Sequence, residues 1–426
     1  MSFLARFLGG PMASADVSGT GAPEQWLVDI FGGMVTASGF RVSVRDARSV
    51  PGIQACIRVF GDDLSKVPLA LYRRKRGGGR EVADYKPQHK LVKFGPAPWL
   101  SSHRWRRVLW DACLAHGNAF SKVVRNGMGV PIRCSNTAIG AVSVRWTAEG
   151  EPFFDFTSRS NQLRGLTYMD MIHLAYQETS DGVPDGGSIG VSPIMLHREA
   201  VALSIATERF AASFFRNGAK PSLALETEKS MNDEVFNRLR QQVEANYSGL
   251  PNMHKVMILE MGLKLKQISS TNVDSQLTEI RKEQAVQHCI MYGMPPHKIG
   301  ILDRATNNNI EHQGIDYVTG PVSSKAKALE EALNLSLLTD VEREEFYFEH
   351  NLDALHRGDL LSRYRAYAIG RQWGWLNVDE IRDYENRNPL PDDAGKTYLQ
   401  PLNMTKPGAG SKDDTPDDAR DDDKKD

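Results

Sequence analysis

The apolar and polar positions of the chain follow a helical repeat most clearly between residues 190 and 221. Ser192 and Pro193 are typical of a helix start, because a serine side chain accepts hydrogen bonds from the first free amides and proline needs no partner there. Gly218 and then Pro221 end the run, so the pattern predicts one helix of about 24 residues, roughly 36 Å long. Small residues recur along it, which favours close packing against neighbouring helices. The small residues that we expect at such contacts are Ala200, Ser204, Ala206 and Ala211.

A second helical pattern follows further along the chain. Val273, Leu277 and Ile280 recur at helical spacing, and the residues from Asp274 to Tyr292 favour a helix throughout. Gly293 closes the segment, since glycine readily adopts the left-handed conformation that ends helices. The sequence therefore predicts two long helices that flank an insert.

The insert between the two helices combines strand and helix patterns. Its apolar and β-branched residues occur in short runs, and Met261-Gly262 marks a turn between the last two runs. The expected elements are a strand at Leu223–Glu226, a helix at Asn232–Tyr247, and strands at Val256–Glu260 and Leu263–Ile268. Such a set predicts a small α+β module carried on two helices.

Ahead of the first long helix, helices alternate with hairpins. An apolar stripe at helical spacing follows Ser49 and Pro51, and a second helix is expected at Ser102–His116, ended by Gly117. Asn126-Gly127 is a hairpin signal. The stripe consists of Ile53, Cys56, Ile57, Phe60, Leu64 and Val67. The expected strands are Pro68–Arg74, Ala119–Arg125, Val142–Trp146, Phe153–Phe156 and Met169–Leu174. These patterns predict an α+β domain.

A polar run follows the second long helix. Its core spans residues 304–309, where asparagine and threonine side chains compete with the backbone for hydrogen bonds, so the run favours a loop. A helix resumes near Ile310 and continues to about Leu338. Gly320-Pro321 falls inside this helix, and we expect a kink there because proline lacks an amide hydrogen and clashes with the preceding turn.

The composition fits a large globular chain with more than one core. Of its 426 residues, 41% are hydrophobic and 25% are charged. No run of 18 apolar residues occurs, so we expect no membrane span, and the first ten residues lack a convincing signal-peptide pattern. The cysteines are far apart and form no C-x-x-C pair, which favours reduced thiols and no structural zinc. They are Cys56, Cys113, Cys134 and Cys289.

Charge is spread unevenly, with an acidic C-terminal tail. The segment Ser411–Asp426 carries a net charge of −4, whereas the whole chain carries −1, so the remainder is close to +3. This balance argues against tight phosphate binding, which depends on many Lys and Arg contacts that release counterions. It suits a conduit through which DNA slides, and it suits equally a protein that never touches DNA. The tail has no large apolar residue and is expected to be disordered.

One motif points to an enzyme. Gly186-Gly187-Ser188-Ile189-Gly190 satisfies the G-x-S-x-G pattern of α/β-hydrolases, with Asp316 and His350 downstream in the right order. That motif needs a buried strand running into the serine, whereas Asp181–Asp185 is a polar loop, so we expect no enzyme and keep a serine hydrolase as a remote alternative. The sequence also contains no G-x-x-x-x-G-K-[ST] loop and no H-x-x-x-H pair, so neither a cofactor nor a metal is expected.

Several separated motifs occur together in a specific order along the chain. They are Gly190-Val191-Ser192-Pro193-Ile194, Phe214-Phe215-Arg216-Asn217-Gly218-Ala219, Tyr292-Gly293-Met294-Pro295-Pro296, Asn308-Asn309-Ile310-Glu311, Gly358-Asp359, Gly374-Trp375-Leu376-Asn377-Val378-Asp379-Glu380-Ile381-Arg382 and Glu385-Asn386. No single motif is decisive, but their ordered set is specific. It resembles the portal proteins of tailed bacteriophages, in the branch typified by the Hong Kong lambdoid phage, from about Val35 to Leu402.

This resemblance implies an α+β portal fold and a division of the chain into named parts. The implied parts are a flexible N-terminal arm (1–34), an α/β wing (35–190), a first stem helix (191–221), a clip (222–269), a second stem helix (270–293), a tunnel loop with a kinked helix and a return to the wing (294–350), crown helices (351–402) and a disordered acidic tail (403–426). The tunnel-loop residues implied to face DNA are Arg304, Thr306, Asn307, Asn308 and Asn309. In the clip, Lys264 and Lys266 are the expected contact residues.

The resemblance also implies a function. A portal ring of twelve copies occupies the unique vertex of the capsid in the virion, seeds shell assembly in the host cytoplasm, and passes double-stranded DNA during packaging and ejection. Its implied partners are further copies of itself, DNA, the terminase large subunit, the major capsid protein or a scaffold, and a head-tail adaptor, with no membrane. Two other non-enzyme alternatives stay open: a different capsid or head-completion ring protein, and a sequence-nonspecific DNA-binding module.

Overall fold

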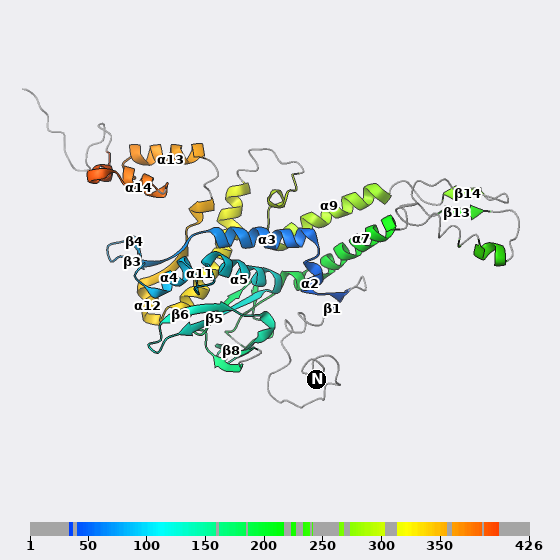
Figure 1. Cartoon of the computed structure of the whole chain (residues 1–426), viewed down its shortest axis with the longest axis horizontal. Coiled ribbons are helices and arrows are strands. Elements are labelled where there is room, and N and C mark those ends of the chain that lie inside the picture. The colour runs from blue at the N-terminus through cyan, green and yellow to red at the C-terminus, as the bar shows by residue number, and fades with distance from the viewer. Residues whose placement is uncertain are drawn as a thin grey trace, which may run out of the picture. The chain divides into compact units, whose positions relative to one another are not determined.

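A computed structural model of the chain describes most of the region between residues 34 and 399. The described residues are 34–36, 41–158, 162–184, 186–216, 223–226, 233–238, 241, 264–267, 273–302, 313–355, 360–385 and 387–399. The chain divides into two compact units, Met1–Ala354 and Leu355–Asp426, which we treat separately. Figure 1 shows their helices and strands. Within the described residues, no helix is both long and apolar enough to cross a membrane.

The first unit alternates helices with short antiparallel strands. Its helices are α2 (Val44–Ala47), α3 (Pro51–Lys66), α4 (Pro87–Lys93), α5 (Ser102–His116), η1 (Ile139–Ala141), α6 (Pro193–Leu196), α7 (Arg198–Arg216), α9 (Val273–Tyr292), η3 (Pro296–Ile299), the π-helical η4 (Val318–Val322), α11 (Ser323–Leu337), α12 (Asp340–Glu345) and η5 (Leu352–Leu355), the last of which ends at the unit boundary. The expected helix at Ser102–His116 is confirmed, and Gly117 ends it in the left-handed conformation with φ of 80°.

The strands of the first unit form several small antiparallel sheets. The strands are β1 (Met34–Val35), β2 (Arg41–Val42), β3 (Leu69–Arg74), β4 (Arg80–Val82), β5 (Asn118–Arg125), β6 (Pro131–Asn136), β7 (Val142–Trp146), β8 (Pro152–Thr157), β9 (Gln162–Leu166), β10 (Met171–Ala175), β11 (Glu178–Thr179), β12 (Ile189–Gly190), β13 (Leu223–Glu226), β14 (Lys264–Gln267) and β15 (Phe346–His350). Three of the sheets have three strands, in the orders β10-β5-β6, β15-β3-β4 and β7-β8-β9. The mixed helix and sheet content predicted from the sequence is confirmed.

The core of the first unit lies between α3, α5 and the sheets. All six residues of the predicted apolar stripe, five on α3 and Val67 just beyond its end, are fully buried, which confirms that stripe. The sheets β10-β5-β6 and β7-β8-β9 share a second apolar cluster, in which the rings of Phe120 and Phe154 meet edge to face at 5.9 Å. Arg106 on α5 is also buried, and its guanidinium donates to the carbonyl of Val67 at 2.7 Å, just beyond the end of α3. The packing of α3 against α5 thus forms the surface against which the later helices pack.

The long helix after residue 313 contains the irregularity that its proline predicts. The chain is helical from 313 to 337, and residues Val318–Val322, which include Gly320 and Pro321, form a π-helical segment. Proline cannot donate an amide hydrogen, and the wider π turn accommodates the missing bond without ending the helix. At the position of the predicted kink the structure thus has a π-helical segment, and the helix continues through it.

The second unit is small and mainly helical. Its elements are α13 (Leu360–Gln372), α14 (Val378–Tyr384) and η6 (Pro391–Lys396). Asn377 caps α14 in a capping box with Glu380, in which each side chain bonds the other residue's backbone amide at 2.8 Å. The acidic tail predicted after residue 403 lies outside the described residues.

Candidate functional site

The segment before α7 is fixed to the β-sheet domain by a close backbone approach at Gly190. A β-carbon added at Gly190 would lie 2.0 Å from the carbonyl oxygen of Gly117, so no other residue fits this position. The side-chain amide of Asn118, which is fully buried, donates to the Gly190 carbonyl at 2.7 Å and accepts from its amide at 3.0 Å. His173 contacts the same amide oxygen at 2.8 Å. This junction sets where the following helices start.

The first long helix begins as predicted but is broken once. Ser192 accepts from the amide of Met195 at 3.4 Å, so the predicted N-cap is confirmed, and its hydroxyl donates to the Ala115 carbonyl at 2.8 Å. His197 then leaves the helical conformation, with φ of −105° and ψ of 28°. The prediction of a single helix was therefore wrong. A short α6 precedes α7, and the hydroxyl that caps α6 also bonds the end of α5. The expected end at Gly218 lies outside the described residues.

α7 and α9 lie side by side and are joined by a buried polar pair (Figure 1). The Oγ of Ser204 on α7 lies 3.0 Å from Nε2 of His288 on α9. The single hydroxyl hydrogen of Ser204 already bonds the Ala200 carbonyl at 3.0 Å, so Nε2 of His288 must donate to Oγ. The side chain of His288 is therefore the neutral tautomer that carries its proton on Nε2.

A second buried pair repeats this arrangement one helical turn away. The amide nitrogen of Gln284 donates to the hydroxyl of Thr207 at 2.9 Å, and that hydroxyl donates to the Leu203 carbonyl at 2.8 Å. Thr207 follows Ser204 by three residues, whereas Gln284 precedes His288 by four, so the two helices are antiparallel. Because each buried pair joins one side chain of α7 to one side chain of α9, the two pairs specify the register of α7 against α9.

Burial keeps His288 uncharged. Only 4% of its surface is exposed, and burial lowers the pKa of the imidazole to about 4. Its Nδ1 atom has no hydrogen-bond partner and faces Gly52 on α3, where an added β-carbon would lie 2.6 Å away. Protonation of His288 would add an N–H at Nδ1, where it would face Gly52 and have no hydrogen-bond acceptor. The part of the α7–α9 pair that contains His288 is thus in close contact with α3.

The structure separates the four small residues of α7 that the sequence singled out. Ser204 and Ala211 are buried, at 2% and 6% exposure, whereas Ala200 and Ala206 are only half-buried. Ser204 makes its contact within the subunit, as described above. Ala206 is therefore partly accessible at the side of α7, whereas Ala211 lies in the interior. Their role in contacts between subunits stays a prediction.

An apolar row follows the exposed side of α6 and α7. Leu196, Leu203 and Phe210 recur every seven residues, and each is more than half exposed. On α7, Leu203 and Phe210 lie on one face because they are seven residues apart, and Ala206 shares that face because it is three residues from Leu203. An exposed apolar stripe of this length on a water-soluble helix is typical of a contact surface.

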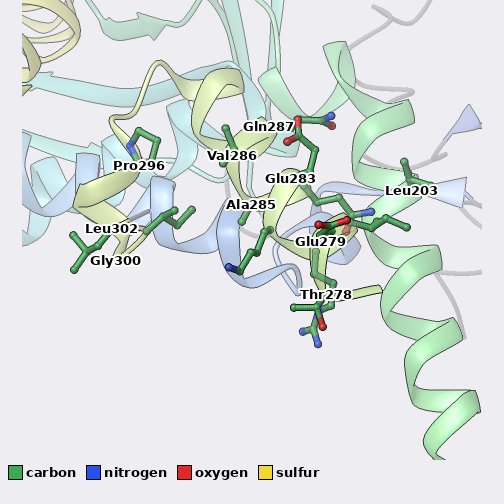
Figure 2. A pocket seen from close by; sticks show the side chains of 15 residues that line it. Leu203, Thr278, Glu279, Glu283, Ala285, Val286, Gln287, Pro296, Gly300 and Leu302 are labelled. Carbon is green, nitrogen blue, oxygen red and sulfur yellow. The ribbon is translucent and has the colours of Figure 1, made fainter. Parts of the chain in front are cut away.

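A groove of about 1170 Å³ runs beside α9 (Figure 2). Leu203 of α7 lines it on one side, and Pro296 of η3 and Leu302, which follows η3, line it on the other. Along α9 its lining includes Glu279 and Glu283. The apolar row of α7 and this groove therefore meet at Leu203.

The segment 303–312 lies outside the described residues, but the two chain ends that flank it are held together. Nδ1 of His297 lies 2.8 Å from the side-chain oxygen of Gln313, and the ammonium of Lys298 sits 4.7 Å from the centre of the Tyr317 ring. Tyr317 is buried and donates its hydroxyl hydrogen to Asp63 of α3 at 2.9 Å. Burial and the Asp63 carboxylate raise the pKa of the Tyr317 phenol. The segment is thus connected at both ends to a fixed base on α3.

All five predicted tunnel-loop residues, Arg304, Thr306, Asn307, Asn308 and Asn309, lie in this undescribed segment. The two predicted clip residues fall on β14, which pairs with β13 so that Lys264 lies opposite Glu226 and Lys266 opposite Ala224. The strands expected at Leu223–Glu226 and Leu263–Ile268 are confirmed within one residue at each end. The strand expected at Val256–Glu260 lies outside the described residues.

The hydrolase alternative fails on geometry. The hydroxyl of Ser188 donates to the carboxylate of Glu178 at 2.6 Å, and the strand that follows it, β12, has only two residues. His350 is buried in β15, where its Nδ1 contacts Glu330 at 2.9 Å and its Nε2 has no partner. Asp316 is exposed on the helical turn 313–317. Ser188 therefore does not contact His350, and the triad does not form.

Sequence reasoning missed the residues that hold this site together. Asn118, His288 and the Asp63–Tyr317 pair are buried polar groups whose partners are 55 to 254 residues away. The available signal was polarity at positions where a helical or strand period expects an apolar residue, as at Asp63 inside the α3 stripe. That signal marks a buried polar group but does not identify its partner.

The described geometry defines an α+β subunit with a paired antiparallel helix extension. Comparison with solved structures shows the same fold. The chain matches a subunit from the neck of a native gene transfer agent particle computed with C12 symmetry, with a TM-score of 0.54, 21% identity, and coverage of 81% of this chain and 94% of that one. It also matches the crystal structure of an HK97-family phage portal protein from Corynebacterium diphtheriae, with a TM-score of 0.52, 16% identity, and coverage of 77% and 98%.

Sequence comparison identifies the family. The model of the phage portal protein family matches residues 51–386. The chain is 27% identical to the probable portal protein of Streptomyces phage phiC31 over 88% of its own length and 83% of that protein. It is 25% identical to the portal protein of Enterobacteria phage HK97, with 84% of each chain covered. The chain belongs to the phage portal protein family, and the resemblance inferred from its motifs is confirmed.

Proposed function

We propose that twelve copies of this chain form a closed ring at the unique vertex of a phage capsid and that double-stranded DNA passes through its central channel. Family membership supports the portal role, and the C12 symmetry of the related neck particle supports the number of copies. The ring would nucleate shell assembly in the host cytoplasm with the major capsid protein or a scaffold. It acts as a structural conduit and not as an enzyme.

The parts of the subunit take the following roles in this proposal. α7 and α9 form the stem, and the segment 351–402, which contains α13 and α14, forms the crown. The insert that contains β13 and β14 forms the clip, where Lys264 and Lys266 contribute to docking of the terminase large subunit and later of a head-tail adaptor. The domain that carries α3, α5 and the three-stranded sheets forms the wing.

One observation carries the assignment of a channel loop. The chain ends on either side of segment 303–312 are held together by the His297–Gln313 and Lys298–Tyr317 contacts, and Tyr317 is anchored on buried Asp63. A segment held at both ends on a rigid base can contact a moving ligand without loosening the fold. The intervening residues include Arg304 and three asparagines, which suit brief contacts with phosphate rather than tight binding.

DNA packaging in vitro tests this assignment. Replacing Arg304 with alanine is expected to change packaging rate, slippage or DNA retention and to leave ring assembly intact. Replacing Asn307, Asn308 and Asn309 together with lysine adds three cations per subunit, so packaging is expected to slow, most strongly at low salt where screening is weak. Removal of Arg104, an exposed cation on α5, is the matched control and is expected to change nothing. Unchanged translocation by the lysine variant at every salt concentration would show that the segment does not line the DNA path.

The ring itself is tested by native mass measurement. Twelve chains of 47.4 kDa give a particle of about 570 kDa. Electron micrographs of the same sample are expected to show rings with a central opening. A protein that stays monomeric under all conditions, including in the presence of capsid protein or scaffold, would overturn the proposal.

A further inference from the structure

The helix α13 in the unit Leu355–Asp426 uses one face to pack against α14. The ring of Tyr367 stacks on that of Tyr384 at 6.2 Å, and the guanidinium of Arg363 pairs with Glu385 at 2.7 Å. The Tyr367 hydroxyl donates to the same carboxylate at 3.1 Å. Residues 363, 367 and 370 lie on one side of a helix, and a β-carbon added at Gly370 on that side would lie 2.8 Å from the side chain of Leu376. One face of α13 is thus fully accounted for within the unit.

The opposite face of α13 is apolar and exposed. Leu361, Arg365 and Ile369 follow one another at four-residue spacing, and Trp373 continues the row. The exposed fractions of Leu361, Ile369 and Trp373 are 59%, 50% and 46%. A surface helix normally has one apolar stripe that faces its own core, whereas α13 has apolar residues on both sides. The second stripe, which we call the α13 outer face, is defined by Leu361, Arg365, Ile369 and Trp373.

The charges of this unit are segregated along the chain. From Leu360 to Val378 the sequence contains three arginines and no acidic residue, whereas from Asp379 to Lys396 it contains six acidic and three basic residues. The Arg363–Glu385 pair cancels one charge on each side. The α13 segment therefore keeps a charge of +2 and the α14–η6 segment a charge of −2.

We propose that the α13 outer face of one subunit packs against the α14–η6 segment of the next subunit and closes the crown as a head-to-tail ring. This inference rests on the proposed portal ring. Two copies of the α13 outer face set against each other would bring their Arg365 side chains together, whereas the α13 outer face against α14–η6 joins Arg365 with a segment of charge −2. A contact between two different surfaces repeats around a ring, and the apolar row supplies the buried centre of that contact.

Paired substitutions test the apolar part of the contact. The double variant Leu361→Ser with Ile369→Ser removes two exposed apolar side chains, so subunit folding is expected to stay unchanged while the half-life of the ring on dilution, followed by mass photometry, falls at least tenfold. The matched control is Met128→Ser with Val341→Ser, which removes two exposed apolar side chains from the first unit. Equal ring half-lives for the double variant and the wild-type protein would overturn the inference.

Charge reversal tests the pairing of unlike surfaces. Arg365→Glu is expected to shorten the ring half-life, and Asp383→Arg with Asp392→Arg is expected to do the same. Combining all three changes restores opposite charges across the contact, so the half-life is expected to return toward that of the wild-type ring. If Arg365→Glu leaves the ring half-life unchanged and weakens only DNA retention, the face binds DNA and the inference is wrong.

Cross-linking identifies the neighbour directly. All four native cysteines are buried, so a short bis-maleimide is expected to react mainly with cysteines introduced at the surface. Rings that carry both Ile369→Cys and Asp392→Cys are expected to give a ladder of linked chains on a denaturing gel, and each single variant is expected to give none. Dimers from Ile369→Cys alone would show face-to-face pairing, and links only within one chain would show that the chain covers its own face. Either result overturns the inference, whereas failure of the wild-type protein to form any ring overturns the proposed function itself.

Discussion

The α7–α9 pair and the α13–α14 unit differ in which side chains they bury and which they expose. Between α7 and α9, polar side chains are buried and hydrogen-bonded to each other within the subunit, as in the Ser204–His288 and Thr207–Gln284 pairs. In the second unit, large apolar side chains stay exposed on α13. Buried polar pairs specify one arrangement because an unpaired group is costly, whereas exposed apolar faces are completed by another molecule. Contacts within the subunit thus hold α7 against α9, whereas the exposed apolar residues of α13 are those that the proposed ring contact would cover.

The largest expected effect concerns the junction that positions the helix extension. Gly190→Ala would place a β-carbon 2.0 Å from the Gly117 carbonyl and would disturb both hydrogen bonds to Asn118, so we expect a loss of about 4 kcal/mol in the free energy of unfolding. Gly127→Ala is the control, since nothing lies within 4 Å of its added carbon. Denaturant unfolding measures both. A Gly190→Ala protein as stable as the control would mean that the junction tolerates movement.

Phenylalanine substitutions on α7 distinguish interior from surface. Ala211 is buried, so Ala211→Phe is expected to lower subunit stability by about 1 to 3 kcal/mol through overpacking. Ala206 is half-buried on the exposed row, so Ala206→Phe is expected to spare subunit folding and to impair ring assembly. Unfolding curves of the subunit and native mass of the assembly separate the two outcomes. Equal effects of both substitutions on assembly would remove the distinction drawn between these positions.

Stability at acid pH tests whether His288 is buried in its neutral form. Burial lowers the pKa of His288 in the folded state to about 4, whereas the unfolded chain has an ordinary value near 6.5. The unfolded chain therefore takes up a proton first, so the stability that neutral His288 provides is complete above pH 6.5 and is lost as the pH falls from there toward 4. Between pH 7 and pH 5 this amounts to about 2 kcal/mol. His288→Gln is expected to reduce the pH dependence by that amount in denaturant unfolding. An unchanged pH dependence would place the protonation elsewhere.

The smallest effect is expected on the α13 outer face in an isolated subunit. Because Leu361 and Ile369 are at least half exposed, replacing either with serine is expected to change the free energy of unfolding by less than about 0.5 kcal/mol. The same change at Ile57, which is fully buried on α3, is expected to cost about 3 kcal/mol or more. Thermal unfolding of the isolated subunit measures this difference. A large loss at Leu361 would mean that the subunit itself covers this face.

Much of the fold was predictable because local sequence and final structure agree. The α3 stripe, the Ser102–His116 helix and the second long helix have strong periodicity and clear end signals, and all three are confirmed. The Gly320-Pro321 irregularity is likewise local, because proline acts through its own missing amide. The Asn126-Gly127 hairpin is confirmed between β5 and β6, with Gly129 rather than Gly127 in the left-handed conformation. The predicted loop residues 304–309 stay a prediction, as do the clip contacts.

The amino-acid sequence by itself determined the element types, their order and, through ordered motifs, the portal family, because periodicity and capping act over a few residues. Tertiary structure alone decided what depends on distant partners. The break at His197 has no signal in the local pattern, and the α7–α9 register depends on which buried groups meet. The anchoring of Tyr317 on Asp63 joins residues 254 positions apart. Such contacts are set by three-dimensional proximity, which no local pattern encodes.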